Sequence, residues 1–324
     1  MTDDDRTLRE VGEFSVIDRL VAGRRQPDSV LIGPGDDAAV ITAPDGRAVI
    51  STDMLVQDRH FRLDWSTPHE VGRKAIAQNA ADIEAMGARA TAFVVAVGAP
   101  ADTPARHLEE LSDGLWAEAR RAGAAGIVGG DLVSSPLWVV SVTVFGDLGG
   151  RAAVTRGGAR PGDTVAVAGT LGTSAAGFEL LSADGPRLPE FEDLCRRHRV
   201  PQPPYGQGEA AALAGARAMT DVSDGLLADL GHIAVASGVR IDVASEALQP
   251  DVAALSGPAD RLRTDALGWV LGGGEDHALA ACFPGAPPAE WRTIGTVSAA
   301  GTAGPGAFVD GRPWTGSSGW ESFN

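Results

Sequence analysis

Short apolar segments alternate with helix-like segments along the whole chain, and this alternation limits the folds that the chain can adopt. In the first half, residues 47–51, 92–97 and 137–145 have the length and apolar character of strands. Residues 164–168 begin a second series of the same kind. Repeated alternation of this type predicts a fold of the α/β or α+β class. A chain of 324 residues has the length of two domains.

A glycine-rich segment, residues 146–151, separates the two series of apolar segments. Because the pattern restarts after it, we expect an N-terminal domain at residues 1–149 and a C-terminal domain at residues 150–324. Within the second domain, residues 182–208 are rich in proline and charge. That composition predicts a long surface connection around one helix.

Two helices of the first half have recognisable ends. Residues 67–70 (Thr-Pro-His-Glu) form a capping-box pattern, and the helix that follows should stop at Gly87. Residues 103–104 (Thr-Pro) open a second helix, which should end before Gly123. In the second half, residues 218–238 predict a strand, a turn and a helix in succession.

Carboxylates recur at the turns between these elements. Ligand sites in open α/β sheets lie at the carboxyl ends of strands, so we expect these carboxylates to meet at one cleft. The positions are Gly33–Asp37, Ser51–Asp53 at the end of strand 47–51, Asn79 and Asp82 on one helix face, Gly129–Asp131 after a strand at 125–128, Thr220–Gly225 before a helix, and Gly272–Asp276.

This combination of residues has a chemical meaning. Glycine allows the backbone to approach a phosphate closely and to adopt positive φ. Aspartate oxygens are hard ligands that suit Mg²⁺, which can bridge phosphate oxygens. Phosphoryl transfer between two anions requires mainly that their charges be neutralised and their positions fixed. The pattern therefore predicts an ATP-using, metal-dependent enzyme.

Each motif also has a simpler structural interpretation. An aspartate pair after glycine is commonly a turn or a helix cap, and for that pair alone this is the better interpretation. Ser223 or Asp224 is a good N-cap for the helix that follows, so capping and function are about equally supported there. Six such motifs in one chain together favour a functional site.

Composition excludes several other classes of protein. The net charge of −16, without a compact basic stripe, disfavours nucleic acid as a partner. Lys74 is the only lysine and precedes Ala75, so no lysine P-loop is present. Cys195, Cys282 and the six histidines show no zinc-site spacing. No segment is long and apolar enough to span a membrane, and we expect a cytoplasmic protein.

Eight segments carry a resemblance to a known family: GEFSVIDRL, GPGDDAAV, STDMLV, NAADIEAMGA, GGD, TRGGARPGD, DVSDGLLADL and GGGEDHAL. In this order they resemble the thiamine-monophosphate kinase family, within the superfamily of aminoimidazole-ribonucleotide-synthetase-like proteins. The resemblance extends from Gly12 to Trp320. It implies direct transfer of the γ-phosphoryl group of ATP to thiamine monophosphate, several Mg²⁺ ions, and no phosphoenzyme.

The resemblance also implies a fold and a set of site residues. The N-terminal mixed-sheet domain would pair across a homodimer into a shared barrel-like sheet, followed by a C-terminal α/β domain. The implied metal ligands are Asp37, Ser51, Thr52, Asp53, Asp82, Asp131, Asp221 and Asp224. ATP would contact Gly130, Asp131, Arg156 and Ser223, and the thiamine substrate would contact His60, Glu275 and Trp320. The catalytic residues would be Asp53, Asp82, Asp131 and Arg156.

Two alternatives remain open from the sequence. Aminoimidazole-ribonucleotide synthetase is the nearest enzyme alternative, and a non-catalytic protein that binds Mg-nucleotide is the alternative from another class. Selenophosphate synthetase and the hydrogenase-maturation dehydratase use cysteines that this chain lacks at the matching places. The chain departs from the usual family pattern at Ala81, Glu84, His277 and Ala278.

Overall fold

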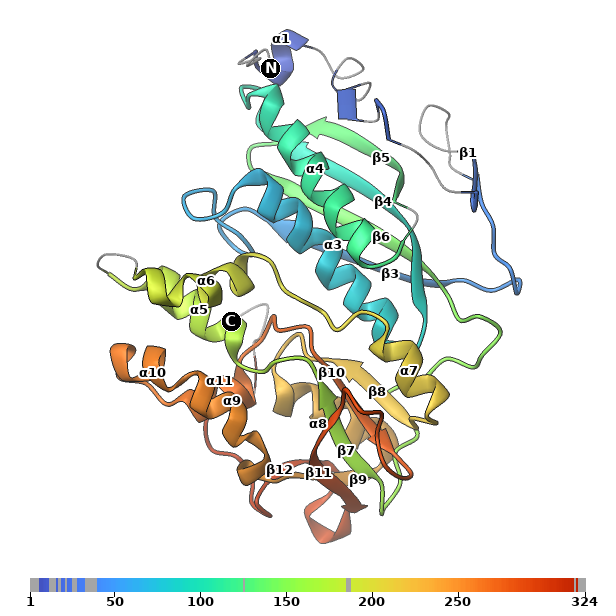
Figure 1. Ribbon diagram of the computed structural model, residues 1–324, viewed down its shortest axis with the longest axis vertical. Helices are drawn as coiled ribbons and strands as arrows, with labels where there is room; N and C mark the ends of the chain where they lie inside the picture. Colours follow the sequence, from blue (N-terminus) through green and yellow to red (C-terminus); the bar gives the residue numbers. More distant parts are fainter. Residues whose placement is uncertain are drawn as a thin grey trace. The chain divides into compact units, whose positions relative to one another are not determined.

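The chain divides into two compact units, each described by itself below (Figure 1). The structure is a computed structural model that describes residues 6–11, 16, 19–20, 22–24, 28–32, 40–124, 126–184, 188–317 and 319. Unit 1 comprises Met1–Ile83 and Arg89–Arg151, and unit 2 comprises Glu84–Ala88 and Ala152–Asn324.

Unit 1 is built on a four-stranded mixed sheet with the order β3-β6-β4-β5. Strands β3, β6 and β4 are antiparallel neighbours, whereas β4 and β5 are parallel. Their bounds are β3 Val49–Val56, β4 Arg89–Ala99, β5 Ile127–Ser134 and β6 Val139–Asp147; the unit also holds α1 Leu8–Val11 and the pair β1 Val30–Ile32 and β2 Val40–Ile41.

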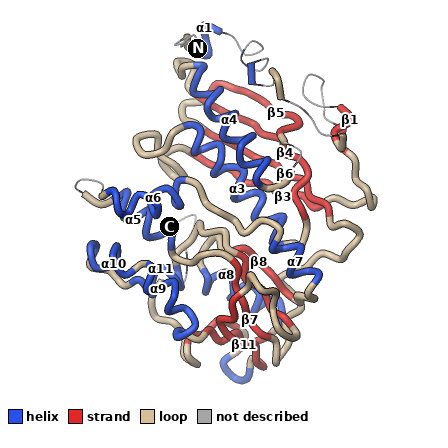
Figure 2. Tube along the Cα trace, in the orientation of Figure 1, coloured by secondary structure: helices blue, strands red, loops and turns tan. Residues whose placement is uncertain are grey.

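Helices α3 (Pro68–Ala85) and α4 (Ala105–Arg121) lie on the same side of this sheet, as Figure 2 shows. The capping box forms as the sequence predicts, because the backbone N–H of Thr67 donates to Glu70 and the N–H of Glu70 donates to the Thr67 hydroxyl. The two helices approach closely, since a Cβ atom added at Gly114 would lie 2.0 Å from the His69 carbonyl oxygen. Glycine is therefore required at that crossing.

The two faces of the unit 1 sheet differ in character. The helix face is covered, and its apolar side chains Leu55, Val140 and Val142 are all buried. The opposite face carries the exposed side chains of Ile50, Thr52 and Met54 on β3. We call it the open face; in addition to these three residues it holds Asp131 and Val133 of β5, according to the strand register.

Unit 2 contains a six-stranded sheet with the order β12-β9-β11-β7-β10-β8, in which only the β12–β9 pair is parallel among the described pairs. The strand bounds are β7 Thr164–Ala168, β8 Ala218–Asp221, β9 Val239–Val243, β10 Leu279–Phe283, β11 Arg292–Ala299 and β12 Gly306–Val309. The helices are α5 Thr173–Ser182, α6 Glu192–Arg199, α7 Gln207–Leu213, α8 Leu226–Ser237, α9 Gln249–Ala254, α10 Ser256–Leu262 and α11 Ala266–Gly272, with the 3-10 turns η1 Pro189–Phe191, η2 Ser245–Leu248 and η3 Gly301–Ala303.

The central strands of unit 2 are buried on both faces. Along β7, Val165 and Val167 belong to the core that includes Leu230 of α8, whereas Ala166 and Ala168 belong to a second core on the other face. A strand covered on both sides needs a continuous apolar sequence, and β7 reads Thr-Val-Ala-Val-Ala. The mixed α/β class expected from the sequence is thus confirmed.

Three sequence-based expectations about the fold are wrong. Ser51–Asp53 and Gly129–Asp131 do not follow their strands but lie inside them, in β3 and β5. In β3 the alternation of exposed residues with more buried ones extends past the motif to Leu55, and in β5 the buried Leu132 follows the motif. Residues 182–208 are more than a surface connection, because Cys195 and His198 of α6 are buried.

None of the helices in the described part of the chain combines the length and the apolar character needed to cross a membrane.

Candidate active site

In unit 1, polar side chains of β3 and α3 meet on the helix face of the sheet. The Ser51 hydroxyl donates a 2.6 Å hydrogen bond to Oδ2 of Asp82. The backbone N–H of Asp53 donates to Oδ1 of Asn79 at 3.2 Å, and the Asn79 amide in turn donates to the Ala75 carbonyl. Because Ser51 and Asp53 are two residues apart on a strand, both side chains point to the same face. The structure therefore brings together Ser51, Asp53, Asn79 and Asp82.

Thr52 and Asp131 lie on the open face instead. The Thr52 hydroxyl donates to the Val142 carbonyl at 2.9 Å. Asp131 occupies the same row across the sheet as Met54, through Ser141 and Ala96. Asp53 and Asp131 stand on the two edge strands, about 14 Å apart by the usual strand spacing. The expectation that these carboxylates converge at strand ends is therefore wrong within unit 1.

Gly130, next to Asp131, has no room for a side chain. A Cβ atom added there would lie 2.1 Å from the Val95 carbonyl oxygen. Any other residue would displace β5 against β4, so the pairing of these two strands requires glycine at this position.

His60 ends a tight turn after β3. The N–H of Val56 donates to His60 Nδ1 at 3.0 Å, and the N–H of His60 donates to the Val56 carbonyl at 3.0 Å. Because Nδ1 accepts a hydrogen bond, the proton of the neutral ring lies on Nε2. Lys74 of α3 holds the same turn, since its Nζ donates to the His60 carbonyl at 2.8 Å.

Two of the predicted site residues, Asp37 and Trp320, lie outside the described residues, as does the whole Gly33–Asp37 turn.

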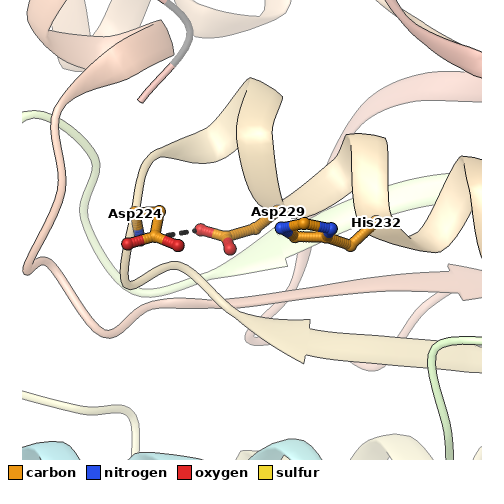
Figure 3. Close-up of side chains that lie close together, drawn as sticks. All are labelled: Asp224, Asp229 and His232. Atoms are coloured by element: carbon orange, nitrogen blue, oxygen red, sulfur yellow. Dashed lines mark hydrogen bonds between the residues drawn. The ribbon is translucent and has the colours of Figure 1, made fainter. Parts of the chain in front are cut away.

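In unit 2, the turn between β8 and α8 carries Asp221, Ser223 and Asp224. Of the two interpretations open from the sequence, capping by Ser223 or Asp224 does not occur, since the N-cap of α8 is Gly225 and it has no side-chain cap. Asp229 of α8 holds the turn itself, because its Oδ2 accepts the backbone N–H groups of three turn residues at 3.0–3.1 Å: Ser223, Asp224 and Gly225. Figure 3 shows the bond between Asp224 and Asp229. The side chains of Ser223 and Asp224 are therefore not used for capping.

Asp229 also belongs to a group that could hold a cation. Ligand atoms of Asp224, Asp229 and His232 all lie within 4.8 Å of one another. Burial raises the pKa of Asp229 to about 7, and the negative charges of Asp221 and Asp224 raise it too. A cation beside these carboxylates would offset that electrostatic cost. The sequence reasoning missed Asp229 and His232, and their spacing on one helix face was the available signal.

The Gly272–Asp276 motif pairs with this turn through the backbone. The N–H of Glu275 donates to the Ser223 carbonyl at 2.7 Å, and the N–H of His277 donates to the Val222 carbonyl at 2.9 Å. A Cβ atom at Gly274 would lie 2.7 Å from the Ser223 carbonyl, so this contact requires glycine. The structure thus brings Glu275 next to Ser223, although they are far apart in the sequence.

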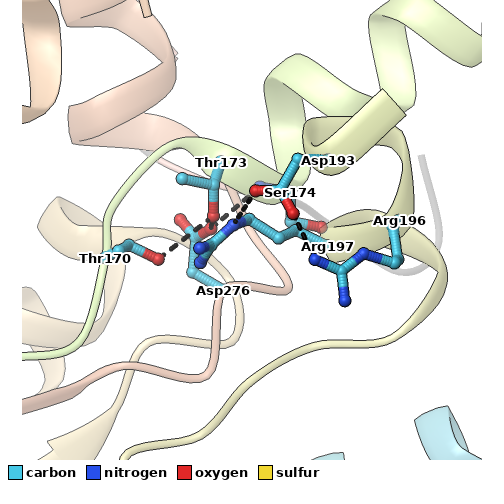
Figure 4. Close-up of polar contacts among 7 residues, drawn as sticks. All are labelled: Thr170, Thr173, Ser174, Asp193, Arg196, Arg197 and Asp276. Carbon is cyan, nitrogen blue, oxygen red and sulfur yellow. Dashed lines mark hydrogen bonds and ion pairs between the residues drawn. The ribbon is translucent and has the colours of Figure 1, made fainter. Parts of the chain in front are cut away.

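The two acidic residues of this motif have different surroundings. Asp276 is buried and accepts hydrogen bonds from Thr173 and from the backbone of Ser174, at the start of α5 (Figure 4). Glu275 is bonded through its main chain to the β8–α8 turn instead. His277 lies 3.1 Å from Asp221, between Nδ1 and Oδ2. The departure from the family pattern at His277 therefore places an imidazole ring next to a predicted metal ligand.

Arg156 lies beside the same strand end. Its Nε donates to the Thr220 hydroxyl at 3.4 Å, and the residue is exposed. In unit 2 the predicted residues Arg156, Asp221, Ser223, Asp224 and Glu275 thus all gather around the end of β8.

The contacts of Glu84 explain why this chain has a glutamate where the family usually has a small apolar residue. It is 4% exposed and accepts the backbone N–H groups of Gly206 and Gly208 at 2.9 and 2.8 Å. Burial raises the pKa of this carboxyl group. Glu84 therefore caps the start of α7, where a small apolar residue would leave two N–H groups without an acceptor.

Comparisons of the sequence and of the structure with known proteins point to the same family. Residues 35–148 match the family described as AIR synthase related protein, N-terminal domain. The chain is 65% identical over 318 residues to thiamine-monophosphate kinase of Mycobacterium tuberculosis, covering 98% of this chain and 93% of that protein. It is 46% identical over 325 residues to thiamine-monophosphate kinase of Corynebacterium glutamicum, covering 99% and 96%. The solved structure of AaThiL complexed with AMPPCP and TMP is similar with a TM-score of 0.76, at 31% identity and 98% coverage of each chain.

Proposed function

We propose a reaction from the premise that this chain belongs to the thiamine-monophosphate kinase family. The chain transfers the γ-phosphoryl group of ATP to thiamine monophosphate and releases ADP and thiamine diphosphate. The observation that carries this function is the likeness over nearly the whole chain to kinases of that name. The similar structure that holds AMPPCP, an ATP analogue, together with TMP supports it further.

The transfer is direct. A terminal oxygen of the substrate phosphate forms a bond to the γ-phosphorus of ATP, while the bond from that phosphorus to the bridging oxygen of ADP breaks. The accepting phosphate is already largely an anion near neutral pH, so no general base is needed. The protein's task is therefore to hold two anions in line and to reduce their repulsion.

The carboxylates are proposed to hold Mg²⁺ ions. Ser51, Asp53 and Asp82 form an oxygen-only group on one face of β3, which fits a hard cation. Bound Mg²⁺ would neutralise phosphate charge and orient the phosphate oxygens. The remaining proposed ligands are Asp37, Thr52, Asp131, Asp221 and Asp224.

ATP is proposed to contact Gly130, Asp131, Arg156 and Ser223. The guanidinium of Arg156 is always charged and can donate two parallel hydrogen bonds to phosphate oxygens. Gly130 is exposed and has no side chain, so a nucleotide can approach its backbone closely. Asp229 fixes the backbone of Ser223, since its Oδ2 accepts the Ser223 N–H at 3.1 Å, and the Ser223 hydroxyl is proposed to contact ATP.

Thiamine monophosphate is proposed to contact His60, Glu275 and Trp320. The hydrogen bond from Val56 to Nδ1 leaves Nε2 of His60 as the donor atom of the ring. Glu275 supplies a negative charge for the cationic thiazolium ring, and Trp320 supplies an aromatic surface for stacking. Gly319, which precedes Trp320, lies against the β8–α8 turn, since a Cβ atom added at Gly319 would lie 3.0 Å from the Asp224 carbonyl oxygen.

A homodimer is part of the proposal. The open face of the unit 1 sheet exposes Ile50 by 58%, Met54 by 53% and Val133 by 53%. Three exposed large apolar side chains on one sheet face, beside Thr52 and Asp131, are typical of a surface that another chain covers. Sedimentation velocity should give the mass of a dimer, and Met54→Asp should shift it to the mass of a monomer.

The domain limits 1–149 and 150–324 and a cytoplasmic location remain proposals, supported by the glycine-rich segment 146–151 and by the composition.

An assay of ADP release tests the reaction. The purified chain is given Mg²⁺ and ATP with thiamine, with thiamine monophosphate, or with the purine precursor that aminoimidazole-ribonucleotide synthetase uses. We expect ADP only with thiamine monophosphate, and loss of that ADP when EDTA removes the metal. ADP with the purine precursor and none with thiamine monophosphate would reject the proposal.

A further inference from the structure

A buried histidine contacts the carboxylate that is proposed to recognise the substrate. His198 of α6 is 6% exposed, and its Nδ1 lies 3.4 Å from Oε2 of Glu275. The same Nδ1 lies 3.0 Å from the Ser174 hydroxyl, and the ring centroid lies 5.3 Å from that of Phe178. The orientation of the imidazole is thus fixed from two sides.

Ser174 connects this histidine to the other acidic residue of the same loop. Its backbone N–H donates to Asp276 at 2.9 Å (Figure 4). Its hydroxyl lies 3.0 Å from Nδ1 of His198. Asp276 is therefore anchored to the start of α5, and the main chain of Glu275 is anchored to Ser223 by its N–H. With the main chain fixed on both sides, the direction of the Glu275 side chain depends on its own contacts.

An ionised carboxylate can only accept hydrogen bonds. The contact with His198 is consequently attractive when the proton of the imidazole lies on Nδ1, and that one N–H is then shared by the Ser174 hydroxyl at 3.0 Å and the Glu275 carboxylate at 3.4 Å. In that neutral form the histidine fixes the carboxylate without cancelling its charge, and the full negative charge remains for a cation.

We propose that His198 is a positioning residue, which holds the Glu275 carboxylate in the orientation that recognises the cationic ring of the substrate. The proposal rests on the proposed function and on the proposed role of Glu275. His198 acts on substrate selection through Glu275 and takes no part in phosphoryl transfer.

The test compares two substitutions of similar size. His198→Leu removes the donor, whereas His198→Asn keeps an N–H group near the position of Nδ1. We expect His198→Leu to raise KM for thiamine monophosphate about tenfold, as for a lost hydrogen bond to a charged group. KM for ATP and kcat should stay within about twofold. His198→Asn should restore most of the affinity.

Two further measurements distinguish the orienting of Glu275 by His198 from a general effect of the substitution on the structure. In a Glu275→Gln background, His198→Leu should raise KM no further, because the residue acts through Glu275. The uncharged thiazole phosphate that lacks the pyrimidine substituent should inhibit wild type and His198→Leu equally. His107→Leu on α4 is the matched control and should leave all constants unchanged.

Each outcome decides the proposal. If His198→Leu does not fold, His198→Gln replaces it, because glutamine places its amide near Nε2 and should raise KM whereas asparagine should not. An unchanged KM for thiamine monophosphate, or equal increases for both substrates, overturns the role of His198 while the kinase function stands. A wild-type protein inactive on thiamine monophosphate overturns the function and this inference together.

Discussion

Nζ of Lys74 donates a 2.8 Å hydrogen bond to the main-chain carbonyl of His60. Lys74 is the only lysine among 27 lysine and arginine residues, and it is 1% exposed. The contact ties α3 to the turn that carries a proposed substrate residue. Lysine fits where the larger planar guanidinium of arginine would have to displace the core.

Lys74→Met should therefore affect both stability and substrate binding. The loss of the donor should lower the free energy of unfolding by about 1–3 kcal/mol, because the His60 carbonyl loses its buried partner. KM for thiamine monophosphate should rise more than KM for ATP. Urea unfolding and steady-state kinetics measure these effects. Arg120→Met, at an exposed position of α4, is the control, and equal effects of the two substitutions would contradict the prediction.

Asp53→Asn and Asp131→Asn should each lower turnover by orders of magnitude while the fold survives. The two residues lie on opposite faces of the unit 1 sheet, so a large effect of both would show that each face serves the reaction. Circular dichroism checks the fold, and ADP release gives the rate. Asp102→Asn, on an exposed turn, should be neutral. Near-normal activity of either site variant would mean that the metal assignment is wrong.

Asp276 should make stability depend on pH. Burial raises the pKa of Asp276 to about 6, although Ser174, Thr173 and Gly172 donate hydrogen bonds to it. The folded protein then binds a proton more tightly than the unfolded chain does. The contribution of this group to stability should accordingly be fully present below about pH 4 and fall as the pH rises through about 6, by up to about 3 kcal/mol.

Urea unfolding at about pH 4.5 and about pH 7 measures this dependence, since the two values lie on either side of the folded-state pKa. Other buried carboxylates contribute in the same direction, so the informative quantity is the difference between wild type and Asp276→Asn. The variant should show a smaller fall in stability over this range. An identical fall in both proteins would contradict the prediction.

Glu84→Ala should destabilise the protein by about 1–3 kcal/mol, because it leaves the N–H groups of Gly206 and Gly208 without their acceptor. Thermal unfolding measures the change, and Glu110→Ala on the exposed side of α4 is the control. A melting temperature equal to that of the control would show that water replaces the carboxylate.

The local sequence predicted some parts of the fold well. The helix after Thr67 and the strand at 164–168 follow from capping and from apolar runs, which depend on neighbouring residues only. The ends of β3 and β5 were not predicted correctly, because in each strand a motif rich in polar residues was interpreted as the strand end. Inside a sheet with one exposed face, such residues alternate with buried ones and the strand continues.

The candidate site, like the fold, was predictable only in part. The motifs identified the residues, but their pairing depends on contacts between distant segments. The contact of Glu275 with Ser223 arises from an approach of two backbone segments that single motifs do not encode. The bonds from the β8–α8 turn to Asp229 likewise depend on the folded turn. Buried partners such as Lys74 and His198 carried no motif, and only their burial and contacts in the folded chain identify them.

The most direct test of the central claim follows the phosphoryl group itself. The purified chain is incubated with Mg²⁺, ATP labelled at the γ-phosphorus, and thiamine monophosphate, and the products and the protein are separated. We expect label in thiamine diphosphate, in step with ADP, and none on the protein. Label that remains in ATP, that appears only as free phosphate, or that becomes attached to the protein would contradict direct transfer to thiamine monophosphate.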